Sequence, residues 1–187
     1  MRNIKQADPQ SGFSYVDVMI AIVILLVGVL AMMAAISAAV VRAKGHEQQN
    51  LAKQVITSTM EGIMSVKEEG NNPDVTLKWA RLGNIGNNYE GGIPQGIFLN
   101  DWHTVMEMPG PDNVLGTIDD EGAEMLGIKR QIIITDICSP DQPSIACDPP
   151  GTHAVTVRLI QIEVAYYIGS VEHIERAETL VTHYAAE

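Results

Sequence analysis

The hydrophobic positions near the amino terminus form an unbroken run rather than a stripe. No charged residue and no proline lies between Val18 and Val41, a stretch of 24 residues (18 to 41). About 20 apolar residues are enough for an α-helix to cross a bilayer. A helix that is apolar on every side must be covered by lipid or by other helices. The pattern therefore predicts a membrane segment at residues 18–41.

The pattern then becomes amphipathic without any sign that the helix ends. Apolar side chains recur every three or four residues at Leu51, Val55, Ile56, Met60, Ile63 and Met64. This spacing places them on one face of a helix, which a sheet can cover. Pro73 marks the end, because proline disfavours helical backbone in the residue before it. We predict one long helix over residues 13–69.

The residues after this helix have no clear periodicity. Ten of the sixteen glycines lie between residues 70 and 127, and such a composition favours turns and loops. Short apolar pieces at 97–99 and 104–108 are candidate strands. We expect residues 70–127 to form an irregular, surface-exposed connection.

The last third of the chain, residues 128–187, is typical of β-structure. Its three candidate strands are Ile128–Ile137, Ala154–Ile168 and Glu175–Tyr184, with a turn at Gly169-Ser170. β-Branched residues and alternating apolar positions both favour strands. The predicted fold class is therefore α+β, with the amphipathic half of the long helix packed on a small antiparallel sheet of three strands.

The second candidate strand contains a change of phase. Its apolar side chains occupy odd positions up to Leu159 and even positions from Ile160 onward. One extra residue in a strand produces such a change of face. We therefore predict a β-bulge at Leu159/Ile160.

Two cysteines, Cys138 and Cys147, follow the first candidate strand in a proline-rich loop. An even number of cysteines in a chain that leaves the cytoplasm permits a disulfide. Closing this short loop is worth about 2–3 kcal/mol in the chain-entropy model. A Cys138–Cys147 disulfide is the favoured interpretation and two free thiols are the alternative, while the spacing fits no zinc motif.

Charge and motifs restrict the function. The 187 residues carry 12 basic and 23 acidic side chains, a net charge of −11, and a general nucleic-acid groove needs a basic stripe instead. The sequence has no Gly-x-Ser-x-Gly motif and no paired histidines. Acidic residues within 112–121 suit calcium by type but not by spacing. We expect no enzyme, no cofactor, no metal site and no general nucleic-acid binding.

A distinctive layout precedes the apolar run. A leader with two basic residues ends at Gly12, Phe13 follows, and Asp17 is the fifth residue after the glycine. A carboxylate at the start of a membrane segment is costly, which indicates a function. From Gly12 to about Val41, and more loosely to about Glu69, the chain resembles the type IV prepilin and type II secretion pseudopilin superfamily.

The resemblance implies a sequence of processing and assembly steps. A prepilin peptidase would remove the leader, residues 1–12, by cutting between Gly12 and Phe13, and would then methylate the new amino terminus of Phe13. Asp17 would neutralise the amino terminus of a neighbouring subunit during assembly. Residues 18–41 would leave the inner membrane to form the filament core, and the implied fold is pilin-like.

Three features favour a minor subunit within this superfamily. The acid is Asp where the family usually has Glu, and the apolar segment lacks the proline that kinks many major pilins. Gly28 and its neighbours look like the segment of pilus-modification minor pilins and I-type minor pseudopilins. The implied partners are the prepilin peptidase, other pilin or pseudopilin subunits and the inner membrane, and the final location is a periplasmic or extracellular filament.

The main alternative is a single-span, membrane-anchored periplasmic binding domain that does not polymerise. An ordinary signal-anchor helix would explain Asp17 as a boundary residue. A secretory signal peptide has an apolar core of only about 7–15 residues, which is shorter than the run at 18–41. The sequence does not separate a type IV pilus from type II secretion, nor does it give the task of the filament.

Overall fold

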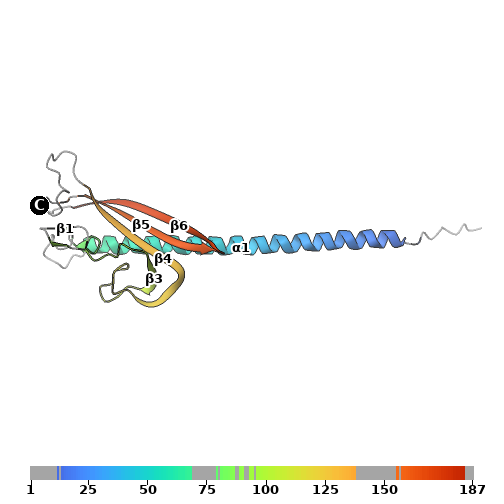
Figure 1. Cartoon of the computed structure of the whole chain (residues 1–187), viewed down its shortest axis with the longest axis horizontal. Helices are drawn as coiled ribbons and strands as arrows, with labels where there is room; N and C mark the ends of the chain where they lie inside the picture. The colour runs from blue at the N-terminus through green and yellow to red at the C-terminus, as the bar shows by residue number, and fades with distance from the viewer. Residues whose placement is uncertain are drawn as a thin grey trace, which may run out of the picture. The chain divides into compact units, whose positions relative to one another are not determined.

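The computed structural model describes residues 12, 14–68, 79, 81–86, 89–90, 93–94, 96–137, 155 and 157–183. The chain divides into two compact units, Met1–Ala43 and Lys44–Glu187. Its elements in chain order are α1 (Tyr15–Glu68), β1 (Tyr89–Glu90), β2 (Ile93–Pro94), β3 (His103–Met108), β4 (Glu121–Ile137), β5 (Val157–Ile168) and β6 (Val171–Thr182) (Figure 1).

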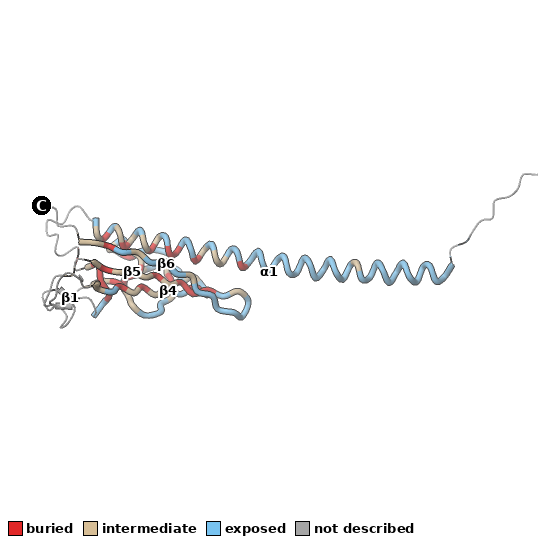
Figure 2. Tube along the Cα trace, turned by 90° about the horizontal axis from the view of Figure 1, so that it is seen from above, coloured by how far each residue is buried: buried red, intermediate tan, exposed pale blue. Residues whose placement is uncertain are grey.

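The long helix predicted from the sequence is confirmed. α1 contains 54 residues and carries Asp17 in its first turn and Lys67 in its last, which suits the helix dipole at both ends. It is long and apolar enough to cross a membrane, judged by length and composition. In the first unit its side chains are exposed from Tyr15 to Ala43, apart from the half-buried Gly28 (Figure 2).

The α+β fold class is also confirmed, although the sheet has four strands rather than three. β3, β4, β5 and β6 lie in that order and each neighbouring pair is antiparallel. β3 corresponds to the candidate strand at 104–108, while the start of β4 falls within the part of 70–127 that was predicted to be irregular. β4 begins at Glu121 rather than at the predicted Ile128. The pattern before Ile128 did not predict a strand because it contains Gly122 and Gly127, both with positive φ, and glycine weakens a strand without necessarily ending it.

The β-bulge predicted at Leu159/Ile160 is wrong. β5 pairs with β4 and with β6 in unbroken register through both residues. The even positions of β5 face the core throughout, but one of them is Arg158, so the apolar pattern seemed to change phase there. Register shifts occur instead between β3 and β4, at Thr104/Met106 and Met106/Met108.

The core of the second unit lies between the amphipathic part of α1 and the sheet, which run alongside one another (Figures 1 and 2). From the predicted stripe, Val55, Ile56 and Ile63 are buried, and Leu51, Met60 and Met64 are partly buried against them. The opposing sheet positions are mainly β-branched: Ile132, Ile134, Ile160, Ile162 and Val164. Helix and sheet therefore bury their apolar faces against each other, as layered domains require.

Candidate assembly segment

The start of α1 is held by a pair of reciprocal hydrogen bonds. The Ser14 hydroxyl accepts from the Val16 amide at 3.3 Å, and Asp17 Oδ2 accepts from the Ser14 amide at 3.2 Å. These bonds satisfy two of the amides that lack partners at a helix start, an arrangement called a capping box. Asp17 therefore has a local structural role within its own chain.

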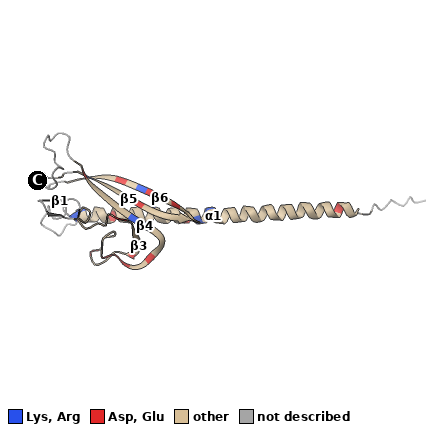
Figure 3. Ribbon diagram, viewed as in Figure 1, with Lys and Arg blue, Asp and Glu red and all other residues tan. Residues whose placement is uncertain are grey.

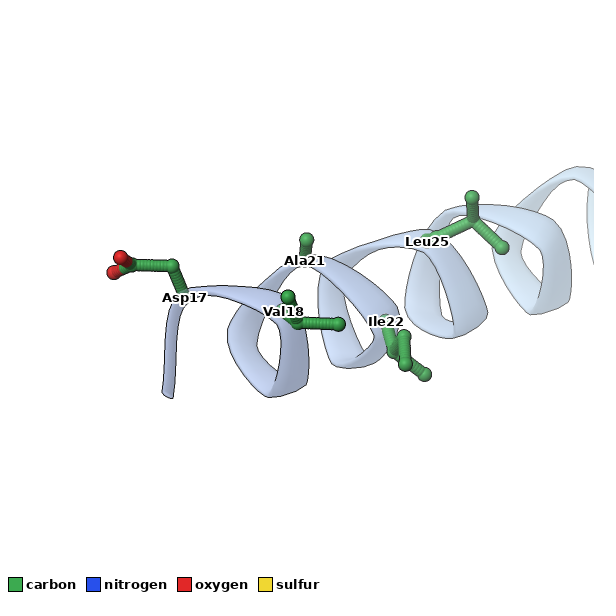
Figure 4. Close-up of a pocket in the computed structure, with 5 residues that line it drawn as sticks. All are labelled: Asp17, Val18, Ala21, Ile22 and Leu25. Carbon is green, nitrogen blue, oxygen red and sulfur yellow. The ribbon is translucent and has the colours of Figure 1, made fainter. Parts of the chain in front are cut away.

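Asp17 also borders a shallow apolar groove on the surface of α1. The groove has a volume of about 250 Å³ and is lined by Asp17, Val18, Ala21, Ile22 and Leu25. Figure 4 shows the Asp17 carboxylate directed away from the four apolar side chains. A charged group and a continuous apolar surface thus lie next to each other at the beginning of the helix.

Charge is distributed unevenly between the two units. Between Tyr15 and Val41 the helix carries one charged side chain, Asp17, and the next are Arg42 and Lys44. Figure 3 shows an uncharged length of α1 between these positions, while the other charges drawn lie on the second unit. Water solvates a surface of this kind poorly, and the helix that carries it is long and apolar enough to cross a membrane, judged by length and composition.

The sequence-predicted site residues differ in how far the structure describes them. Gly12 is described and exposed, and Asp17 lies in the first turn of α1. Phe13, Cys138 and Cys147 lie outside the described residues, so cleavage, methylation and the disulfide stay predictions. Sequence reasoning missed the capping box, although the spacing of Ser14 and Asp17 is the signal for one.

The second unit contains a buried ion pair beside a cavity. Arg130 Nη2 lies 2.8 Å from Asp120 Oδ2, and their side chains are only 5% and 8% exposed. Arg130 Nη1 also donates to Thr59 Oγ1 of α1 at 3.0 Å. Burial lowers the pKa of Arg130, and the attraction of Asp120 opposes that change. The pair thus joins the loop before β4, the sheet and the helix.

This ion pair has a structural explanation that needs no ligand. The adjoining cavity of about 350 Å³ is lined by Leu99, His103, Thr104, Met106, Thr117, Ile118, Asp120 and Arg130. Asp120 already accepts from the Gly116 amide at 2.9 Å as well as from Arg130. Within the described part of the chain, no group of three His, Cys, Asp or Glu side chains is placed to hold a metal ion.

Comparison with protein-family models, with curated proteins and with solved structures found no match to this chain. The features of the chain that bear on its function are the exposed apolar surface of α1 and the carboxylate of Asp17 in its first turn.

Proposed function

We propose that this chain is a structural minor subunit of a type IV pilus or of a type II secretion pseudopilus. The observation that carries the proposal is the combination, within one helix, of an exposed apolar surface and a single carboxylate in the first turn. The Gly12-Phe13 junction stands four residues before that carboxylate. The resemblance to prepilins depends on the same positions.

The apolar surface of α1 suits a subunit that passes from the lipid bilayer into a filament. Burial of apolar surface is worth about 25 cal/mol per Å², so residues 18–41 would be held strongly in the inner membrane. Helices of sister subunits can replace the lipid in a filament, because they cover the same surface without exposing it to water. The subunit would therefore stay in the membrane until assembly begins.

Asp17 supports an ordered assembly step. A carboxylate surrounded by apolar helices is costly unless a positive charge pairs with it. The amino terminus of a processed Phe13, on this chain or a neighbour, would supply that charge. Removing one partner of a buried pair costs about 3–5 kcal/mol, which is enough to exclude an unpaired subunit from the filament.

The first test is the mass of the amino-terminal peptide of protein purified from its native host. We expect a mature chain that begins with N-methylated Phe13. A chain that still begins at Met1 would contradict processing and would favour the anchored binding domain. A chain that begins near Ala39 would indicate an ordinary secreted protein, and the filament proposal would be wrong.

The second test separates the charge of Asp17 from its capping role. Asp17→Asn retains an oxygen that can accept from Ser14, whereas Asp17→Ala loses both the charge and the cap. We expect both variants to insert into membranes and both to be missing from sheared filaments. Glu61→Gln, which removes an exposed acid from the same helix, is the matched control. Normal incorporation of Asp17→Asn would contradict the assembly role.

A further inference from the structure

β6 is an edge strand without the features that usually keep such a strand from pairing. Among the described strands it pairs with β5 alone, and it forms one border of the sheet (Figure 1). Its 12 residues contain no lysine and no proline, and they pair with β5 without a register shift. Natural edge strands are usually protected by short length, lysine, proline or a bulge. β6 therefore has a long, regular edge at which another strand can pair.

The side chains along this edge divide between the two faces of the sheet. Buried residues of β5, such as Ile160 and Ile162, pair with odd-numbered residues of β6. The even-numbered residues of β6 therefore lie on the face opposite the core. Alternate residues of β6 also direct their N–H and C=O groups away from β5. Five even-numbered residues in succession are exposed: Glu172, Ile174, Arg176, Glu178 and Leu180.

This exposed row is complementary to itself when a second copy of β6 runs antiparallel to the first. With Ala177 of the two copies opposite each other, residues 172–182 are paired. Arg176 of each copy then lies opposite Glu178 of the other. Ile174, which is 54% exposed, lies opposite Leu180, which is 61% exposed. Opposite charges and apolar side chains directly across an antiparallel pair stabilise the pairing.

The same charges disfavour the neighbouring registers. A shift of the second copy by two residues in one direction places Arg176 opposite Arg176, and a shift in the other direction places Glu178 opposite Glu178. Like charges directly opposite each other are destabilising. A shift by one residue would turn the side chains of the second copy to the other face of the sheet. The row of charges therefore specifies one register.

The existing contacts of these side chains leave capacity for a second copy. Arg176 contacts Glu163 of β5, and its Nη1 lies 4.0 Å from Glu178 Oε1. Glu178 accepts a hydrogen bond from Gln161 at 2.7 Å. A guanidinium group has five N–H donors and a carboxylate accepts about four hydrogen bonds. Since Arg176 and Glu178 are 56% and 46% exposed, both can also contact a neighbouring strand.

We propose that the chain forms a two-fold symmetric dimer in which the β6 strands of two copies pair antiparallel and join the two sheets into one. The occupant of the edge is a second copy because the charges of β6 match in this register and repel in the neighbouring ones. Such a contact uses one surface twice and closes after two copies, so it does not extend into a filament. Residues 44–68 of α1 run in opposite directions in the two copies. The dimer is therefore a state outside the filament, and this inference does not rest on the proposed function.

The test mixes two charge-reversed variants of the full chain in detergent micelles. Arg176→Glu places acid opposite acid in its own dimer, and Glu178→Arg places base opposite base. In a dimer of one variant with the other, each acid lies opposite a base. We expect each variant alone to dimerise at least about tenfold more weakly than the wild type, and an equimolar mixture to recover the wild-type affinity. Sedimentation equilibrium at matched detergent density measures the dimer fraction.

Lys129→Glu is the matched control, since it changes the net charge by the same amount as Arg176→Glu. Lys129 is exposed on β4, an interior strand of the sheet, so this variant should dimerise as the wild type does. A wild-type chain that is monomeric at micromolar concentration would overturn the proposal. Equal dimerisation of all variants would assign the association to the apolar part of α1 or to another surface, and would also overturn it.

The register is tested by cross-linking in a background in which Cys138 and Cys147 are replaced by Ser. Ile174→Cys and Leu180→Cys are mixed and oxidised with copper phenanthroline, which accepts the electrons released as two thiols form a disulfide. Residues directly opposite have Cα atoms about 4.5–5.5 Å apart, within the range of about 4.4–6.8 Å for a disulfide.

We expect a cross-linked dimer in this mixture and in neither variant alone, because six residues of strand, about 20 Å, separate identical positions. Absence of a cross-link in the mixture, or a cross-link of Ile174→Cys with itself, would overturn the proposed pairing. The mass of the amino terminus is independent of these readouts. A failure of the dimer is therefore distinguishable from a failure of the proposed function.

Discussion

Replacement of Asp120 by alanine tests whether the buried ion pair joins the helix to the sheet. The variant leaves Arg130 only 5% exposed and without its carboxylate. It also removes the acceptor of the Gly116 amide. Among the described residues, the hydrogen bond from Arg130 to Thr59 is then the remaining polar contact between Arg130 and α1. The substitution therefore leaves the buried positive charge of Arg130 without its negative partner.

The expected loss of unfolding free energy follows from this unpaired buried charge. Breaking a buried pair by removing one partner typically costs about 3–5 kcal/mol. The bond to Thr59 and the small residual exposure of Arg130 place our expectation at the lower end of that range. Because domains are stable by only about 5–15 kcal/mol, the loss is a substantial part of the total.

The assay is guanidinium unfolding of the full chain in detergent, followed by tryptophan fluorescence, since Trp79 is buried in the second unit. Glu178→Ala is the control, because Glu178 and its partner Arg176 are 46% and 56% exposed and such pairs contribute about 0–1 kcal/mol. The double variant Asp120→Leu/Arg130→Met should recover much of the stability. An Asp120→Ala cost no greater than that of Glu178→Ala would refute the reasoning.

Three further outcomes are expected. Asn84→Ala should lower the unfolding free energy by about 1–3 kcal/mol in the same assay, because the buried Asn84 amide donates to the Ile132 carbonyl at 2.8 Å; a neutral change would contradict this. The hydrogen bond to Glu172 raises the pKa of Tyr167, so Glu172→Gln should lower that pKa in a tyrosinate absorbance titration, and an unchanged pKa would count against the bond. Reduction of the two cysteines should cost about 2–3 kcal/mol if they form the predicted disulfide, and identical unfolding curves with and without reductant would indicate free thiols.

The long helix, with its apolar first half and amphipathic second half, was predictable because the sequence signals of both halves are local. An uncharged run and a repeat of three to four residues depend only on neighbouring positions. Val55, Ile56 and Ile63 were therefore assigned to the core, and the structure buries them. The charged end of the apolar run could be found in the same way, since Asp17 is the one acid there.

Arg158 shows why the sheet was harder to predict. It occupies a core-facing position of β5, where a charged residue is unusual. Its Nε donates to Asp136 at 2.7 Å, its Nη1 donates to the Leu82 carbonyl at 2.9 Å, and its guanidinium lies over the Trp79 ring. These partners come from distant parts of the chain, so no local pattern identifies Arg158 as buried. The false bulge followed directly from that missing information.

The capping box bears on whether Asp17 can also serve assembly. A carboxylate can accept about four hydrogen bonds, so the bond from the Ser14 amide to Oδ2 leaves capacity for an amino terminus. Asp17→Glu keeps the charge, adds one methylene and suits a capping box equally well. We therefore expect Asp17→Glu to enter filaments at the wild-type level, measured by quantitative mass spectrometry of sheared fractions, while Asp17→Asn is excluded. Exclusion of Asp17→Glu together with incorporation of Asp17→Asn would mean that side-chain length, rather than charge, determines how this helix packs against its neighbours.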